Sequence, residues 1–305
     1  MATASLSIKE GVAFIPEIKN CAKIKKEICP NLFLLPISNK HVKHLKKVIK
    51  DKGYEIKDGT FLYFKGPIKE DGTLYEVFQS YSLALTFYYE GLATCRAYQE
   101  ICDGEYKDIE LFITENDNFG YDEEDKRTLK LIDIKFIREF YKRIYNELSS
   151  KGFNPLMNSL EFFNKFLRER EIKPRLLYLN ICLESIFLSG NDSEGISYKL
   201  GVRCANLLYQ DDNKIDKYDT YTEVKNGYDL RSKIIHGGNY DKESQAIINK
   251  KKTKSNITRT ELDHVLILEK IVKRVYKIVL GDNDLCVSVS NGELGGKIDS
   301  IILSV

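Results

Sequence analysis

The chain contains 305 residues, of which 43% are hydrophobic and 30% are charged, and its formal net charge is +2 at pH 7. These fractions are typical of a soluble globular protein that is long enough for one large domain or two ordinary ones. The small net charge neither requires nor excludes a nucleic-acid partner, because a basic groove can lie on a nearly neutral protein.

The cysteines do not form a zinc-binding pattern, because no Cys-x-x-Cys pair occurs among Cys21, Cys29, Cys95, Cys102, Cys182, Cys204 and Cys286. Their odd number, and the apolar neighbours that mark Cys182 and Cys204 as small core residues, indicate a reducing compartment. The N-terminus has no basic segment followed by an apolar run, and no uncharged apolar stretch approaches membrane-spanning length. We therefore predict a cytoplasmic protein with no membrane partner.

The first part of the chain, residues 1–130, is typical of a mixed α/β region. Short apolar segments interrupted by prolines over residues 10–36 predict strands and turns. An apolar stripe among lysines predicts a helix over residues 39–52, and Gly53 is suited to end it. The remaining expectations are strands at 61–64 and 109–114, either a strand or a buried helix within 74–102, and a linker at 115–126.

From about residue 131 the apolar period becomes that of helices. Helices are predicted at 133–149, 156–170, 174–189, 196–209, 220–236 and 258–280. The last is the clearest, because Thr258 and Glu261 have the spacing of a capping box. We expect an α+β protein with an antiparallel helical bundle over 131–282, a flexible lysine-rich loop at 241–257, and a tail, 283–305, whose apolar runs predict strands that could pair with the N-terminal region.

The segment from Tyr228 to Gly238 places Arg231 and His236 five residues apart at the end of an apolar-periodic stretch. A permanent cation beside a side chain that titrates near neutrality suits phosphodiester chemistry. The spacing alone is weak support, because Arg259 and His264 repeat it. The surrounding sequence must therefore decide which pair is functional.

RNA is cleaved at its own backbone when a 2′-hydroxyl is deprotonated and placed in line with the scissile phosphate. The reaction needs a base, an acid for the leaving 5′-oxygen, and a cation for the negative charge of the transition state. Histidine suits the first two roles because its reference pKa is about 6.5. Arginine suits the third because its planar fork stays charged and matches phosphate oxygens. We expect no metal ion and no other cofactor.

The sequence around the first pair resembles the HEPN superfamily, and within it the Apea-like HEPN group. Residues 228–237 follow the pattern Tyr-Asp-Leu-Arg-Ser-x-Ile-Val-His-Gly, and residues 183–187 and 196–208 fit the family in the expected order. The resemblance extends over about residues 155–280. It implies a metal-independent endoribonuclease with RNA as its substrate and with Arg231 and His236 as catalytic residues. Such proteins often belong to prokaryotic anti-phage or toxin systems, in which a phage-derived or other protein could be the trigger.

Helix geometry separates the two catalytic candidates unless the helix ends near them. Five residues turn through about 500°, which leaves Arg231 and His236 roughly 140° apart around an ideal helix. A helix end at His236 would permit a shared site, and Gly237 and Gly238 favour such an end. One protomer supplies only one suitable histidine. The resemblance implies a homodimer through the helical bundle, in which two Arg/His elements face each other.

Four neighbours are candidates for supporting roles. Ser232 follows the arginine where many HEPN nucleases carry Asn, Asp or His, which puts a third catalytic group in doubt. Asp229 and Glu184 could orient the arginine or the histidine, and Arg203 could contact phosphate. A surface ion pair or a helix cap is an equally good interpretation of each.

The other histidines have simpler interpretations. Arg259 and His264 lie in the first turns of an amphipathic helix beside its core stripe, so we interpret His264 as structural. His41 and His44 lie on the lysine-rich first helix, where a solvated face is a more common explanation than a nucleic-acid patch.

Two other functional classes stay open. The bundle could be a non-catalytic module that dimerises or binds RNA or a nucleotide. The chain could also be a regulatory partner whose N-terminal region, otherwise of unassigned role, senses a ligand. The Arg231/His236 pair favours the nuclease, whereas Ser232 and the modest basic charge favour the alternatives.

Overall fold

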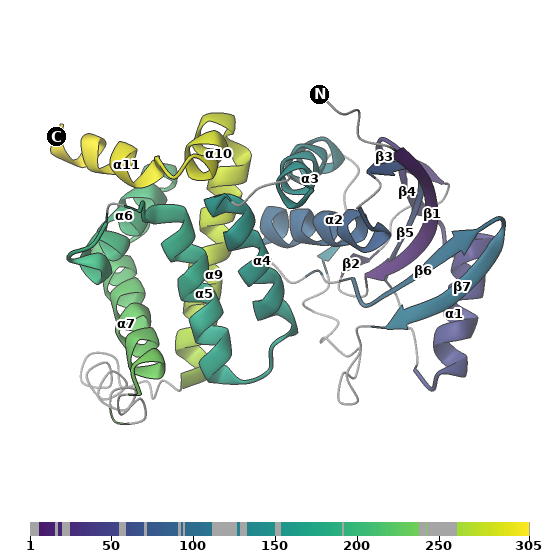
Figure 1. Cartoon of the computed structure of the whole chain (residues 1–305), viewed down its shortest axis with the longest axis horizontal. Coiled ribbons are helices and arrows are strands. Elements are labelled where there is room, and N and C mark those ends of the chain that lie inside the picture. Colours follow the sequence, from purple (N-terminus) through teal and green to yellow (C-terminus); the bar gives the residue numbers. More distant parts are fainter. Residues whose placement is uncertain are drawn as a thin grey trace. The chain divides into compact units, whose positions relative to one another are not determined.

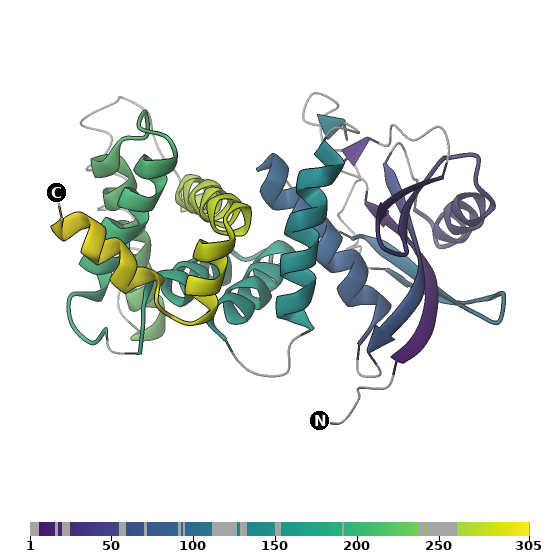
Figure 2. The same ribbon diagram turned by 90° about the horizontal axis from the view of Figure 1, so that it is seen from above.

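The computed structural model describes residues 6–15, 18–19, 25–54, 59–69, 72–90, 93, 95–111, 127–128, 133–149, 154–190, 192–237, 242 and 261–304. The chain forms two compact units, residues 1–149 and residues 150–305 (Figure 1, Figure 2). The first unit combines a sheet with helices and the second is helical, so the α+β fold class is confirmed.

The first unit is built on an antiparallel six-stranded sheet. Its strands, in spatial order, are β3 (Lys26–Cys29), β4 (Leu32–Leu35), β5 (Thr60–Lys69), β1 (Leu6–Ile15), β6 (Ala97–Cys102) and β7 (Glu105–Leu111). A separate parallel pair joins β2 (Ile18–Lys19) to β8 (Arg127–Thr128). The β6–β7 hairpin turns at Asp103 and Gly104, whose φ angles of 52° and 83° suit an Asp-Gly turn.

The sheet is covered by α1 (Lys40–Asp51) on one face and by α2 (Leu74–Tyr89) on the other. Side chains alternate along a strand, so Val12 and Phe14 of β1 point to the α1 side. They pack there with the apolar stripe of that helix, Val42, Leu45 and Ile49. On the opposite face a Cβ at Gly11 would come within 2.8 Å of Leu74, so glycine allows α2 to lie close to the sheet.

The segment left open between strand and helix contains both. It begins with α2, which has a capping box formed by Thr73 and Glu76, and it ends with β6. Almost every position of α2 from Leu74 to Phe87 is buried, so the helix shows little amphipathic period. That is why periodicity could not distinguish it from a strand. The predicted linker at 115–126 lies outside the described residues.

The boundary between the units lies near residue 149 rather than residue 131, because α3 (Ile134–Leu148) packs within the first unit. Arg138 of α3 donates its Nε–H to the carbonyl oxygen of Ile28 in β3 at 2.7 Å. The ring of Tyr141 meets that of Tyr81 in α2 at an angle of 61°. The amphipathic pattern located this helix correctly, but it did not say which core the helix joins.

The second unit is a helical bundle, as expected. Its helices are α4 (Pro155–Arg168), α5 (Ile172–Phe187), α6 (Ile196–Asp211), α7 (Lys217–Ile235), α9 (Glu261–Gly281), α10 (Asn283–Ser290) and α11 (Leu294–Leu303). At the centre, Tyr276 of α9 is fully buried against Phe163, and its hydroxyl is 2.6 Å from that of Ser159 in α4. The predicted loop at 241–257 and the cap residue Thr258 lie outside the described residues, apart from Lys242.

The strands expected in the tail, 283–305, are helices α10 and α11. The apolar alternation from Leu285 to Val289 suggested a strand, but Asp282 caps a helix there. Its carboxylate accepts from the backbone N–H groups of Asp284 and Leu285 at 2.8 and 3.1 Å. These helices pack within the second unit, so the expected pairing with the N-terminal region is wrong.

The described helices were also compared with the length and apolarity that a bilayer requires. None of them is long and apolar enough to cross a membrane.

Candidate functional site

The helix that carries the candidate pair ends where the glycines predicted. Asp216 caps the start of α7 by accepting from the backbone N–H of Asp219 at 2.9 Å. At the other end, the N–H of His236 bonds to the carbonyl oxygen of Ser232 at 3.0 Å, and Gly237 then adopts a φ of +65°. This left-handed glycine ends the helix directly after His236. His236 is therefore the C-cap residue, directly after the last residue of α7.

Arg231 is held by Glu184, which projects from α5. Their atoms Nε and Oε1 lie 3.0 Å apart, and the Nη2–H group donates to Oε2 at 3.2 Å. Only the second contact is aligned as a hydrogen bond. Both side chains are 20% exposed, so the pair lies at the edge of the bundle and not in bulk water. The guanidinium also lies 5.5 Å from the ring centre of Tyr228, one helical turn earlier.

The electrostatics of this pair are those of a partly buried carboxylate beside a permanent cation. Burial raises the pKa of Glu184 above its ordinary value, and the positive charge of Arg231 opposes that rise. Two effects of opposite sign thus act on the same carboxylate. Arg231 thus offsets part of the effect of burial on the pKa of Glu184, and Glu184 in turn holds the guanidinium in position.

His236 is exposed, and so are its neighbours Ile235 and Gly237. No hydrogen bond or ring contact joins its side chain to that of Arg231 within the described part of the chain. One protomer therefore presents an anchored cation and, one and a half turns later, a solvent-facing imidazole. The two groups lie on the same short segment but do not form a closed site by themselves.

The other two candidates on α7 have modest surroundings. Asp229 forms an ion pair with Lys225, one turn earlier, at 2.6 Å, and both side chains are more than a third exposed. It therefore orients neither Arg231 nor His236. Ser232 is half-buried, and its backbone carbonyl accepts the His236 amide described above. In this geometry the Ser232 carbonyl helps to form the end of the helix.

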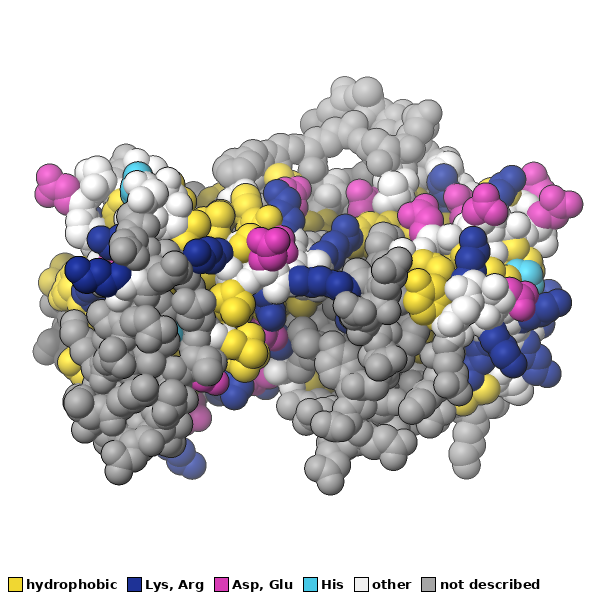
Figure 3. Space-filling view, turned by 90° about the horizontal axis from the view of Figure 1, so that it is seen from below, with side chains coloured by type: hydrophobic (Ala, Val, Ile, Leu, Met, Phe, Trp, Pro, Cys, Tyr) yellow, Lys and Arg dark blue, Asp and Glu magenta, His cyan; other side chains and the backbone are white. Residues whose placement is uncertain are grey.

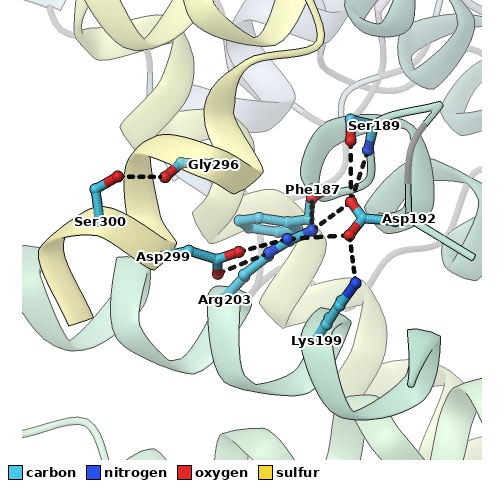
Figure 4. Close-up of polar contacts among 8 residues, drawn as sticks. All are labelled: Phe187, Ser189, Asp192, Lys199, Arg203, Gly296, Asp299 and Ser300. Atoms are coloured by element: carbon cyan, nitrogen blue, oxygen red, sulfur yellow. Dashed lines mark hydrogen bonds and ion pairs between the residues drawn. The ribbon is translucent and has the colours of Figure 1, made fainter. Parts of the chain in front are cut away.

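Arg203 of α6 lies in a separate cluster (Figure 4). Its side chain is 4% exposed, and its guanidinium is enclosed by two carboxylates and a carbonyl group. Nε donates to Asp299 at 3.0 Å. Nη1 donates to the carbonyl oxygen of Phe187 at 2.8 Å and to Asp192 at 2.7 Å. Nη2 donates to Asp192 at 3.2 Å and to Asp299 at 2.6 Å.

These bonds use all the N–H groups that an arginine has. Arg203 therefore has no donor left for phosphate, and its role is structural, which corrects the expected contact. The hydrogen bond from Arg203 is the largest cause that holds the pKa of Asp192 well below its usual range. Sequence reasoning missed Asp192 and Asp299, because their partner is fixed only by the tertiary fold.

His264 of α9 is buried, 3% exposed, and its Nδ1 lies 3.6 Å from a carboxylate oxygen of Glu223 in α7. This environment agrees with the structural role expected for it. Arg259, the other half of the repeated spacing, lies outside the described residues. The two Arg/His spacings therefore differ as their contexts predicted: one histidine is exposed at a helix end and the other is enclosed in the bundle.

Within the described ranges, no group of three or more His, Cys, Asp and Glu side chains is placed to hold a metal ion. Comparison with known proteins adds no relative: no family model matches the chain, and neither does any curated protein or solved structure.

Proposed function

We propose that the chain is a metal-independent endoribonuclease of the HEPN type. The observation that carries the proposal is that an anchored arginine and an exposed histidine lie on the same short segment at the end of α7. The HEPN-like pattern of residues 228–237 supports the same assignment from the sequence. The proposal places the reaction in the cytoplasm. It also includes a role in prokaryotic anti-phage defence or a toxin system, with a protein trigger.

In this reaction Arg231 would bind a non-bridging oxygen of the scissile phosphate, because a guanidinium fork matches phosphate geometry and stays charged. Glu184 would hold the guanidinium in place, and Oε2 can keep its hydrogen bond while another edge of the fork faces the RNA. His236 would take the proton of the 2′-hydroxyl. The 2′-oxygen would then attack phosphorus, and the P–O5′ bond would break.

The leaving 5′-oxygen needs a proton from an acid, which must be a second group because His236 already acts as the base. One protomer presents a single exposed histidine at this segment. A two-fold dimer through the helical bundle would supply the second, because such an axis duplicates every group near it. One His236 would act as the base and the other as the acid. This arrangement would also account for the exposed position of His236 in one protomer.

The products and the metal requirement test the proposal together. Cleavage should continue in excess EDTA and should leave a 2′,3′-cyclic phosphate on the upstream fragment. An RNA with one 2′-deoxy sugar at the cut site should resist. His236→Ala and Arg231→Ala should each slow cleavage about a hundredfold or more. Normal cleavage by His236→Ala, or equal cleavage of DNA, would overturn the assignment.

A non-catalytic RNA- or nucleotide-binding module is the second candidate. The observation that favours it is the engagement of Arg231 by Glu184, which resembles a structural ion pair at a helix surface. In that case Arg231→Ala would weaken binding of an uncleaved RNA, while no preparation of the chain would release a cyclic phosphate.

A further inference from the structure

The exposed side of α1 carries a stripe of lysines in the first unit. Lys40, Lys43, Lys47 and Lys50 are all exposed, and their spacing of three and four residues places them on one side of the helix. None forms an ion pair with another described residue. Dark-blue Lys and Arg side chains gather around a cyan histidine at the end of the molecule where Figure 1 places α1 (Figure 3).

Part of this charge pattern works against the stability of the helix, although Lys50 in the last turn favours the dipole and Asp51 follows Lys47 by four residues. Lysines three and four positions apart repel one another, and Lys40 lies at the positive end of the helix dipole with no acid in the first turn. The helix is held instead by the Asn39 side chain, which accepts from the N–H of His41 at 2.9 Å, and by its buried apolar stripe. Helix formation therefore explains the C-terminal part of the stripe but not Lys40 and Lys43, whereas binding of a polyanion would explain all four lysines.

Aromatic rings continue the surface from α1 onto the sheet. His44 stacks on Tyr106 of β7, with ring centres 3.6 Å apart and an angle of 12°. His41 stacks on Tyr63 of β5 at 5.0 Å, and its Nδ1 is 2.9 Å from the Tyr106 hydroxyl. Phe33 of β4 lies beside Tyr63 at 6.1 Å. Phe33, His41, His44 and Tyr106 are half-buried, and the Nζ of Lys25 lies over the Phe33 ring, 4.1 Å from its centre, where it adds a further cation to this surface.

The charge of this surface comes from lysines, because the histidines are held towards their neutral forms. Burial, followed by the charge of Lys40, lowers the pKa of His41, and burial followed by Lys47 lowers that of His44. The acid Glu10 faces the ring cluster. Its carboxylate accepts from the Tyr63 hydroxyl at 2.8 Å and pairs with Lys65 at 2.8 Å, so its charge is compensated locally.

We propose that this α1 surface, made of Lys40, Lys43, Lys47 and Lys50 with the rings of Phe33 and Tyr106, binds single-stranded RNA. The inference rests on the proposed nuclease function and adds a recruiting surface on the first unit. Lysines beside aromatic rings are a combination that proteins use to bind single-stranded nucleic acids. Phosphates are bound by the cations, and bases stack on the ring faces without sequence preference.

The test uses the full chain with His236→Ala, so that RNA is bound without being cut. Affinity for a fluorescent single-stranded RNA of about 12 nucleotides is measured by anisotropy at several salt concentrations. The variant K40E/K43E/K47E should lose about tenfold or more in affinity, and its log–log salt slope should fall by about 2. The control K135E/K214E/K270E makes the same change of charge at three exposed lysines elsewhere.

A second variant tests the rings. Phe33→Leu should weaken RNA binding about fivefold while it leaves the salt slope unchanged, because stacking and not charge is lost. Both variants are checked for folding by circular dichroism. Equal losses in K40E/K43E/K47E and in the control would overturn the proposal. So would binding of anionic vesicles that depends on the stripe while the affinity for RNA stays the same.

Cleavage of a dinucleotide separates this proposal from the nuclease assignment. For this test the chain keeps its His236. K40E/K43E/K47E should then cleave a dinucleotide at the normal rate, because so short a substrate does not need the α1 surface. A wild-type chain that cuts no RNA refutes the nuclease function but leaves the binding result interpretable. Normal affinity in the charge-reversal variant refutes the α1 surface alone.

Discussion

Glu184 on α5 and Arg231 on α7 contact each other at two points, with Nε–Oε1 at 3.0 Å and Nη2–Oε2 at 3.2 Å, at the edge of the bundle. The contact joins two segments that lie 47 residues apart in the sequence. It fixes the direction in which the only cation of the candidate pair can point. This relationship makes Glu184 a positioning residue in the proposed reaction.

Replacing that carboxylate should lower the rate more than it lowers substrate binding. Glu184→Gln keeps the size of the side chain but removes its charge, so Arg231 loses its fixed position. We expect kcat to fall about tenfold with little change in KM, and the free energy of unfolding to fall by about 1–2 kcal/mol. The decisive measurement is the double variant E184Q/R231A. It should be no slower than R231A alone, whereas additive losses would show that the two residues act independently.

His264 should matter for stability and not for cleavage. It is enclosed between α9 and α7 beside Glu223, so His264→Ala leaves a buried carboxylate without its imidazole neighbour. We expect a loss of about 2 kcal/mol in the free energy of unfolding. At temperatures below its thermal denaturation midpoint, the variant should cleave RNA at a rate within about threefold of the wild-type rate. His236→Ala should show the reverse pattern, with normal stability and little cleavage.

The Arg203 cluster should make the stability of the second unit depend on acidic pH. The pKa of Asp192 lies below its unfolded value of about 3.9, so its contribution is present above that value. It is lost as the pH falls through the lower pKa of the folded state. Asp192→Asn should therefore cost about 3 kcal/mol at pH 7 and only somewhat less at pH 3, because most of the contribution persists until the pH reaches the folded-state pKa; urea unfolding measures both costs.

The matched control for that experiment is Asp229→Asn, which removes an exposed ion pair with Lys225. Exposed pairs contribute little, so its cost should stay below about 1 kcal/mol at both pH values. Equal losses for the two variants at pH 7 would show that the burial of the Arg203 cluster has no energetic consequence.

Mixing active and inactive protomers should expose the shared site. If one His236 is the base and the partner copy supplies the acid, a heterodimer with His236→Ala has an incomplete set. At a one-to-one ratio, after exchange, activity should fall to about a quarter of the wild-type value, the share of intact homodimers. A fall only to half, or full activity in a monomer measured by ultracentrifugation, would contradict the two-fold site.

The sequence predicted α4, α5, α6, α7 and α9, of which α4 has the most clearly one-sided apolar pattern. It failed at the tail, where Leu285 to Val289 alternate like a strand although Asp282 is a good helix cap. It could not resolve α2, because a helix buried on all sides has no polar face to reveal its period.

The candidate site was predictable to the extent that it is local. Arg231, His236 and the helix end lie within one short segment, so their order along the chain shows that they are neighbours. The role of Arg203 was not predictable, because its partners Asp192 and Asp299 lie 11 and 96 residues away. An arginine suits a phosphate contact as well as it suits a structural ion pair. Only the fold shows that the N–H donors of Arg203 are already used.

The closeness of α11 to the bundle sets a limit on how this unit can be transplanted or shortened. A Cβ at Gly295 would come within 2.3 Å of the Phe187 carbonyl oxygen, so α11 rests directly on the end of α5, and Asp299 completes the shell around Arg203. A fusion or truncation that cuts after Gly281, where the bundle looks finished by pattern, would leave a buried guanidinium half-compensated. A fragment that contains the second unit intact must therefore extend to Leu303.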